Sequence, residues 1–152
     1  MVKFVNAAAK SPTVRGAAER VMGIHREAWV PSYSSPTFRS RHESRLRDRP
    51  ADSPGNAKVL LFATCYVNYN EPGIGADLLK VLKHQGIETV LARSEACCGM
   101  PKLELGDLES VARLKDINIP ALAEFAEQGY TIVSPIPSCT LMFKQELPLL
   151  FP

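Results

Sequence analysis

The chain has 152 residues, of which 45% are hydrophobic and 22% are charged, and its formal net charge is +2. It is therefore large enough to build a hydrophobic core without disulfides. No apolar run approaches the length of a membrane-spanning helix, and the N-terminus lacks the apolar stretch of a secretion signal. We expect a cytoplasmic protein whose thiols stay reduced, and a peripheral position at the inner membrane would have to come through a partner.

The charge is divided unevenly along the chain. Residues 1–55 hold ten Lys and Arg against five Asp and Glu, whereas residues 56–152 hold eight against eleven. We interpret residues 1–55 as a basic lead-in that precedes an α/β domain over residues 56–152. The lead-in is predicted to contain an amphipathic helix over residues 14–28, which Trp29 anchors on the domain. An irregular linker rich in Ser, Pro and Arg follows over residues 31–54.

The linker contains a cluster of basic residues, Arg39, Arg41, Arg45, Arg47 and Arg49. This cluster either contacts an anionic surface of a partner protein, a membrane or nucleic acid, or is a solvated part of the linker. The second role is the more common one for a charge run without a fold. No aromatic residues interleave with the arginines, which disfavours nucleic acid because single-stranded bases stack on such residues.

The rest of the chain alternates between short apolar runs and amphipathic segments. The predicted elements are a strand over 57–64, a helix over 72–85, a strand over 87–92, a helix over 105–128 with a break near Pro120, a strand over 130–134 and a helix over 138–147. This βαβαβα order predicts an α/β fold, a three-layer open parallel sheet with crossover helices.

Four cysteines follow the predicted strands. Cys65 comes just after the first strand, Cys97 and Cys98 follow the second by a short loop, and Cys139 lies at the start of the last helix. Open α/β sheets bind ligands at the carboxyl ends of their strands, so we expect the four thiols to meet there. Adjacent cysteines form a strained disulfide, whereas Gly99 lets the backbone turn close to a metal or cluster.

The spacing of these cysteines around the Cys-Cys-Gly motif resembles the cysteine-rich CCG domain family. This domain occurs in the B subunit of heterodisulfide reductase and in iron–sulfur subunits of glycolate and lactate oxidation systems. The segments 64–68, 96–101 and 135–139, together with 142–146, are most similar to the C subunits of anaerobic glycerol-3-phosphate dehydrogenases. The resemblance covers residues 15–152 and corresponds to the first CCG domain with its preceding linker.

The resemblance implies an iron–sulfur electron-transfer module of a flavin-linked dehydrogenase complex, passing electrons toward a quinone or similar acceptor. Cys65, Cys97, Cys98 and Cys139 would be the ligands, and no residue is predicted to be catalytic. The implied partners are a flavin-containing dehydrogenase subunit, a ferredoxin-like module and a second CCG domain, because this sequence has no C-x2-C-x2-C run and no second Cys-Cys-Gly.

The family's fifth cysteine is replaced by Met142. Four thiolates are the ordinary ligand set of a 4Fe–4S cluster, but also of a tetrahedral zinc that would make the domain a docking module without a redox role. A thiol–disulfide switch at Cys97 and Cys98, and four unrelated buried thiols, are further alternatives.

Overall fold

The fold is built around a small parallel sheet. The computed structural model describes residues 1–48, 50 and 57–152. The strands are β1 (Leu46–Arg47), β2 (Lys58–Leu61), β3 (Glu88–Ala92) and β4 (Tyr130–Val133), in the order β1-β3-β2-β4. Every paired strand runs parallel to its neighbour, with Leu60 of β2 opposite both Val90 and Ile132. The predicted parallel α/β sheet is thereby confirmed.

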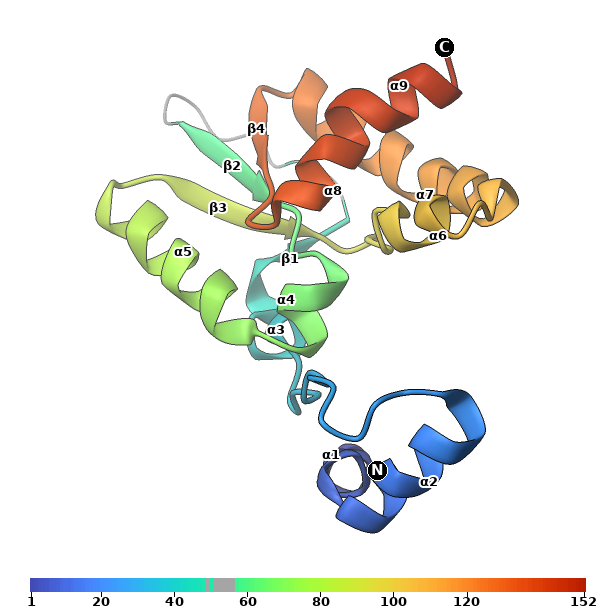
Figure 1. Cartoon of the computed structure of the whole chain (residues 1–152). Coiled ribbons are helices and arrows are strands. Elements are labelled where there is room, and N and C mark those ends of the chain that lie inside the picture. The colour runs from blue at the N-terminus through green and yellow to red at the C-terminus, as the bar shows by residue number, and fades with distance from the viewer. Residues whose placement is uncertain (49, 51–56) are drawn as a thin grey trace.

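Helices connect the strands in the predicted order (Figure 1). They are α1 (Val2–Lys10), α2 (Pro12–Met22), α3 (Phe38–Arg41), α4 (Cys65–Tyr69), α5 (Pro72–His84), α6 (Met100–Glu104), α7 (Leu108–Glu127), α8 (Pro137–Leu141) and α9 (Leu147–Leu150). A short 3-10 turn, Glu43–Arg45, precedes β1, and a π-helical turn, Met142–Glu146, joins α8 to α9. The crossover helices α5 and α7 match the predicted helices, and a proline in the first turn starts α5 where its missing N–H costs nothing.

Alternating side chains of the strands build a core on each face of the sheet. Leu60 and Phe62 point into one core, which α7 and the C-terminal helices complete with Val111, Phe125 and Met142. The intervening Leu61 and Ala63 belong to the other core, together with residues of α3, α4 and α5. The period of two along a strand therefore produces the three layers, with helices on both faces.

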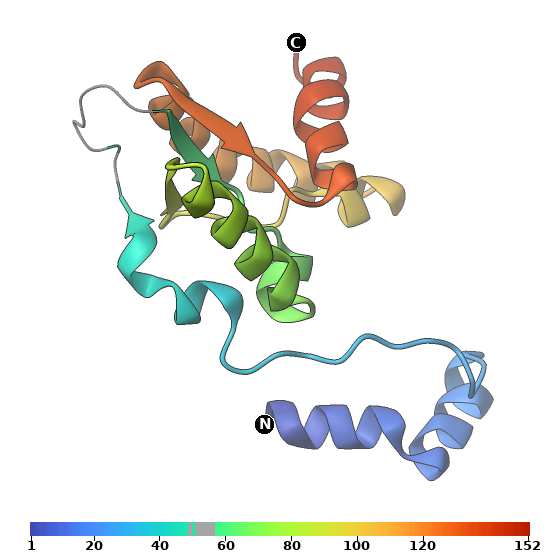
Figure 2. The same ribbon diagram turned by 90° about the vertical axis from the view of Figure 1, so that its left-hand side faces the viewer.

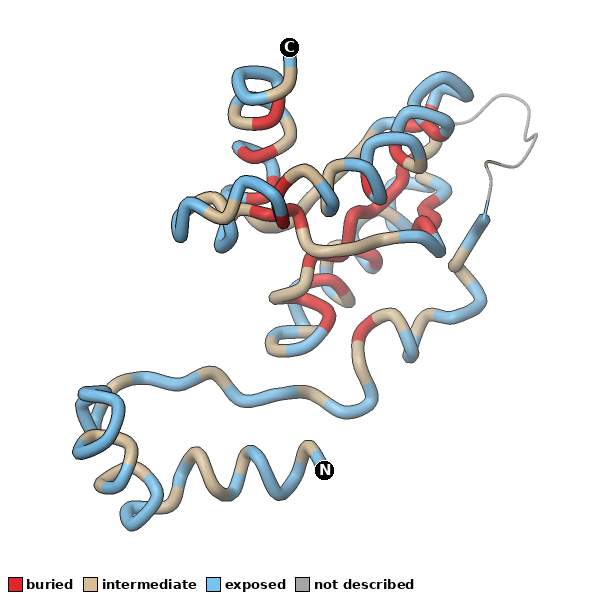
Figure 3. Tube along the Cα trace, turned by 90° about the vertical axis from the view of Figure 1, so that its right-hand side faces the viewer, coloured by how far each residue is buried: buried red, intermediate tan, exposed pale blue. Residues whose placement is uncertain are grey.

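The N-terminal helices differ from the expected single helix over residues 14–28. Two helices, α1 and α2, form there, and neither contains a buried residue. They pack on each other and are joined to the α/β unit by an extended segment (Figure 2), and Figure 3 shows no buried residue along them. The predicted anchoring role of Trp29 is wrong, because this residue is 74% exposed.

The predicted linker over residues 31–54 is wrong for residues 38–47. Phe38 is fully buried in the core beneath α5, and β1 extends the sheet by pairing with β3. The sequence did not reveal that residues 38–47 are packed, because their apolar residues are few and separated by arginines. The expected boundary between residues 55 and 56 lies outside the described residues, but the packed unit already includes Phe38.

Helix α7 continues through Pro120, so the predicted break there is wrong. Proline removes one helical hydrogen bond, but α7 has buried side chains on both sides of it, including Val111, Leu122 and Phe125, and this packing holds the two halves in line. None of the described helices is long and apolar enough to cross a membrane.

Candidate metal centre

Three loops carry the four cysteines to one end of the sheet. Cys65 is the first residue of α4, directly beyond β2, and Cys139 lies in α8, beyond β4. Cys97 and Cys98 lie in the loop between β3 and α6. Figure 1 shows that α4, α6 and α8 all begin at the carboxyl ends of the parallel strands. The topology therefore produces the arrangement that the sequence predicts.

The four sulfur atoms gather in one place. The Sγ atoms of Cys65 and Cys97 lie 3.8 Å apart, and Cys65, Cys98 and Cys139 line the same pocket of about 450 Å³. All four cysteines are free thiols, with Cys98 and Cys139 buried and the other two half-buried. Within the described ranges, no three side chains of Cys, His, Asp or Glu are arranged to hold a single metal ion. A cluster of several irons needs no such tight set, because each thiolate binds its own iron.

Polar groups beside these sulfurs favour their thiolate forms. The backbone N–H groups of Tyr66, Gly99 and Met100 act to lower the pKa values of Cys65, Cys97 and Cys98 respectively, although larger effects raise those of Cys65 and Cys98. The Ser138 side chain acts to lower the pKa of Cys139. Hydrogen-bond donors of this kind stabilise thiolates and tune the potential of iron–sulfur clusters. The set of four soft sulfurs, with polar groups nearby that favour thiolates, therefore fits an iron–sulfur cluster.

The thiols also interact in two pairs. The hydrogen bond from Cys65 lowers the pKa of Cys97, while the same bond, followed by burial, raises the pKa of the Cys65 thiol. In the second pair, the hydrogen bond with Cys139 raises the pKa of Cys98, and that with Cys98 lowers the pKa of Cys139. One member of each pair is therefore the preferred thiolate, which is the form that binds metals.

The glycine of the Cys-Cys-Gly motif has a clear steric role. Gly99 adopts a φ of 99°, which favours glycine, and it caps the N-terminus of α6. A Cβ atom built on Gly99 would lie 3.4 Å from the Cε atom of Met142. Met142 itself is fully buried in the core beside Cys98 and Cys139. This residue, which stands where the resemblance implies a fifth cysteine, is a packed apolar side chain.

A buried carboxylate, which sequence reasoning missed, links two of the cysteine loops. Glu95 precedes the Cys-Cys-Gly motif, and its side chain is only 5% exposed. It accepts the backbone N–H groups of Ala63 and Thr64, both at 3.1 Å, and forms an ion pair with Arg39 at 2.8 Å. Burial raises the pKa of Glu95 to about 7, against the lowering effects of Arg39 and the two N–H groups. A single acidic residue in a loop gave no signal for this role.

A second missed residue fixes the Cys-Cys-Gly loop from the opposite side. Asn118 of α7 is 1% exposed; its Oδ1 accepts the N–H of Ala96 at 2.9 Å, and its Nδ2 donates to the carbonyl of Cys97 at 3.0 Å. The sequence does carry a signal here. Asn118 continues the helical spacing of the buried Val111, Leu122 and Phe125, and a polar residue on a buried helix face needs a partner.

The described arginines of the basic cluster bond to the chain's own backbone. Arg39 donates to the carbonyls of Ala92 and Arg93, and Arg45 donates to that of Thr89. Arg41 and Arg47 likewise donate to carbonyls of neighbouring residues. The solvated-linker interpretation is therefore wrong for Arg39 and Arg45, whereas Arg41 and Arg47 are exposed. Arg49 lies outside the described part of the chain.

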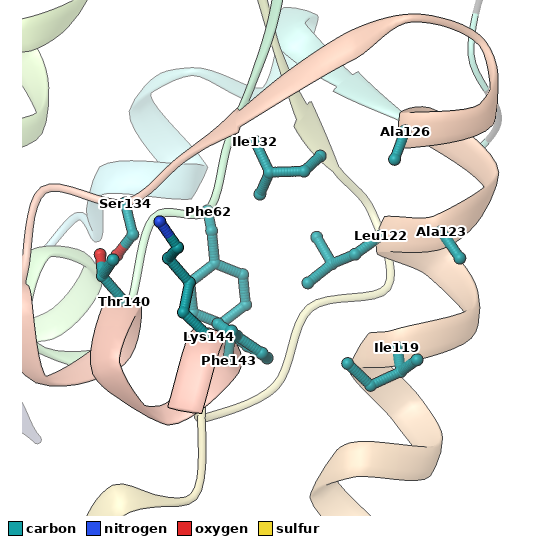
Figure 4. Close-up of a pocket in the computed structure, with 10 residues that line it drawn as sticks. All are labelled: Phe62, Ile119, Leu122, Ala123, Ala126, Ile132, Ser134, Thr140, Phe143 and Lys144. Atoms are coloured by element: carbon teal, nitrogen blue, oxygen red, sulfur yellow. The ribbon is translucent and has the colours of Figure 1, made fainter. Parts of the chain in front are cut away.

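A separate apolar pocket of about 310 Å³ lies behind α8 (Figure 4). It opens between α7 and the C-terminal helices over the edge strand β4. Its lining residues are Phe62, Ile119, Leu122, Ala123, Ala126, Ile132, Ser134, Thr140, Phe143 and Lys144. Thr140, Ser134 and Lys144 supply polar groups on one side of an otherwise apolar wall. Thr140, one of the lining residues, follows Cys139 in α8.

These features are those of a cysteine-rich α/β domain with a thiol cluster at its sheet edge. The family described as CCG, cysteine-rich domain, matches residues 59–144, so the chain belongs to this family. No solved structure matches the chain.

The chain is also similar to a dehydrogenase subunit, a reductase subunit and a lactate utilization protein. The C subunit of anaerobic glycerol-3-phosphate dehydrogenase from Escherichia coli K12 is 29% identical over 146 residues, which are 95% of this chain and 36% of that protein. The B subunit of the CoM/CoB fumarate reductase from Methanothermobacter marburgensis is 33% identical over 97 residues, 63% of this chain and 19% of that protein. Lactate utilization protein A of Bacillus velezensis is 37% identical over 94 residues, 62% of this chain and 37% of that protein. The chain thus spans far less than two thirds of each of these relatives.

Proposed function

We propose that this chain is an electron-transfer module of an oxidoreductase complex, and that Cys65, Cys97, Cys98 and Cys139 hold a 4Fe–4S cluster. The observation that carries the proposal is the meeting of four free thiols from three loops at one end of the sheet. Such a cluster, when bound, supplies one-electron oxidation and reduction. The residues around it would hold the ligands, exclude water and tune the potential.

The resemblance to named dehydrogenase and reductase subunits supports a role within a complex. We propose that the partners are a flavin-containing dehydrogenase subunit and modules that correspond to the remaining length of these relatives. Electrons would pass between the flavin-containing partner and a quinone or similar acceptor, and the complex would lie in the cytoplasm or at the inner membrane through a partner. No substrate-converting site is proposed on this chain.

The apolar pocket behind α8 supports an apolar acceptor. Its wall would receive a flat ring, and Lys144 with the hydroxyls of Ser134 and Thr140 could bind a carbonyl or phenolate oxygen at one end. Filling the pocket with Ala123→Phe should weaken binding of menadione, a simple quinone, measured by isothermal titration. Unchanged affinity would remove the pocket from the proposal while leaving the cluster untouched.

Anaerobic purification followed by iron, sulfide and zinc analysis tests the cluster. We expect brown protein with iron and sulfide in equal amounts, which bleaches on reduction with dithionite. Colourless protein with one zinc per chain would overturn the proposal and establish the docking module instead.

A pair of variants tests the ligand set. Cys139→Ser should remove most of the iron, because the hydroxyl is a poor replacement for a thiolate, whereas Met142→Leu should retain it, because Met142 is packed as an apolar residue. The measurement is iron per folded chain, with circular dichroism as the check on folding. Equal loss in both variants would identify Met142 as a ligand and contradict the four-cysteine set.

A further inference from the structure

We infer that Glu95, held by Arg39, is the positioning residue that sets Cys65 against Cys97. The two cysteines lie on different loops, 32 positions apart in sequence, yet their sulfurs are 3.8 Å apart. The strands that lead into these loops, β2 and β3, pair as far as Leu60 and Val90. Beyond this pairing, the Glu95 carboxylate connects one loop to the other.

Each oxygen of this carboxylate bonds to the turn that precedes Cys65. Oε1 accepts the N–H of Thr64 and Oε2 accepts the N–H of Ala63, both at 3.1 Å. Glu95 itself lies two residues before Cys97, so its side chain spans from one cysteine loop to the other. Moving this carboxylate would therefore move Cys65 relative to Cys97.

The turn that Glu95 holds is strained. Thr64 has a φ of 65°, which is sparsely populated by residues other than glycine. Its hydroxyl accepts the N–H of Val67 at 3.2 Å and so begins α4 at Cys65. A strained backbone persists only where its surroundings fix it, and the two bonds to Glu95 provide this constraint.

Arg39 fixes the carboxylate in turn. Its Nη1 donates to Oε2 of Glu95 at 2.8 Å, and its Nη2 donates to the carbonyls of Ala92 and Arg93, both at 2.8 Å. The arginine side chain is itself only 16% exposed. Its backbone N–H donates to Oδ1 of Asn68 in α4 at 2.9 Å, so α3, α4 and the end of β3 are tied to one ion pair. A buried pair with each partner hydrogen-bonded in this way defines geometry more than it adds stability.

The inference concerns the chain's own thiols and is tested without any metal. The full chain is stripped of metal with a chelator under reducing conditions, transferred to buffer at pH 8.5, and treated with diamide, which accepts the electrons and protons released as the S–S bond forms. Mass spectrometry of peptides then measures which cysteines join and how fast. We expect the wild-type chain to form the bond between Cys65 and Cys97 first.

Glu95→Gln should slow this bond by about tenfold or more, the size of effect expected when a hydrogen bond to a charged acceptor is lost. The amide retains the shape of the side chain but presents an N–H group to one of the donors. Arg39→Met should slow it as well, because the carboxylate then loses its anchor. Asp77→Asn is the control, because it removes an exposed carboxylate whose ion-pair partner is Lys80, and it should leave the rate unchanged.

Thermal unfolding of each variant separates positioning from folding. A folded Glu95→Gln variant that forms the same bond at the wild-type rate would overturn the inference. If Glu95→Gln does not fold, Arg39→Lys, which keeps the charge but loses the fork of donors, supplies the same comparison. Absence of iron from the wild-type protein would overturn the proposed function alone, because the thiol measurement does not depend on it.

Discussion

The two halves of the basic lead-in behave in opposite ways. Helices α1 and α2 carry lysines and arginines and bury no side chain, whereas residues 38–47 are just as basic and form part of the sheet and core. The difference lies in the partners of the arginines. Arg39 and Arg45 donate to carbonyls of β3 and the loop after it, while Arg20 is exposed at the end of α2. Basic composition alone therefore does not define where the domain begins.

Deletion variants should have the largest effect on folding. They also distinguish the part of the lead-in that the domain needs from the part that it does not. Removing residues 1–50 should abolish folding, because it takes away Phe38, Arg39 and β1 together. Removing residues 1–30 should leave the thermal midpoint and the metal content unchanged, because these residues contribute nothing to either core. Circular dichroism and metal analysis of the two purified proteins provide the measurement.

The first of these outcomes differs from what the sequence indicates, since every predicted strand and ligand lies after residue 56. A soluble, metal-loaded protein after deletion of residues 1–50 would restore the linker interpretation. An unfolded protein after deletion of residues 1–30 would instead extend the domain to α1 and α2.

Substitution of one phenylalanine in each half of the lead-in compares their contributions to stability. Phe38→Ala should lower the free energy of unfolding by about 3–5 kcal/mol, the usual cost of truncating a buried aromatic side chain. Phe4→Ala should change it by less than about 0.5 kcal/mol, because Phe4 is 77% exposed on α1. Urea denaturation followed by fluorescence or circular dichroism measures both. Similar losses in the two variants would mean that α1 packs on the domain in solution.

Much of the fold can be predicted from the apolar runs and the helical spacing in the sequence. The apolar runs that become β2, β3 and β4, and the helical spacing of α5 and α7, are enough to predict a parallel sheet with cysteines at its carboxyl edge. Strand β1 could not be predicted in this way. It has only two residues, and it pairs with β3 although one of its residues, Arg47, is charged.

The four thiols of the site could be predicted from the sequence, but the residues that hold the cysteine loops in place could not. Residue type and spacing identify the cysteines as candidate ligands. Glu95 and Arg39, in contrast, cannot be distinguished in the sequence from ordinary surface charges, because they are 56 positions apart and pair only in the folded chain. The positive φ of Thr64 is also invisible, because no glycine marks it. Only Asn118 gave a usable signal, as a polar residue in phase with the buried positions of its helix.

A smaller loss than that of Phe38→Ala is expected where α5 packs against Phe38. A Cβ atom on Gly75 would lie 2.6 Å from Cε2 of Phe38 and 2.8 Å from Cγ1 of Val67, so only a glycine at this position admits the aromatic ring. Gly75→Ala should cost about 1–3 kcal/mol, since a methyl group forced into a packed core displaces its neighbours. Gly73→Ala is the matched control, because Gly73 lies two residues before Gly75 in the same helix.

A Cβ on Gly73 would meet nothing within 4 Å, and alanine favours helix over glycine by about 0.5–1 kcal/mol. The control should therefore be neutral or slightly more stable, which gives the two substitutions opposite signs in chemical denaturation. Combining Gly75→Ala with Phe38→Leu should recover part of the loss, because the smaller side chain leaves room for the methyl group. If Gly75→Ala alone is as stable as the parent, Phe38 does not pack against α5, and the part of the lead-in that it anchors would be as loosely held as α1 and α2.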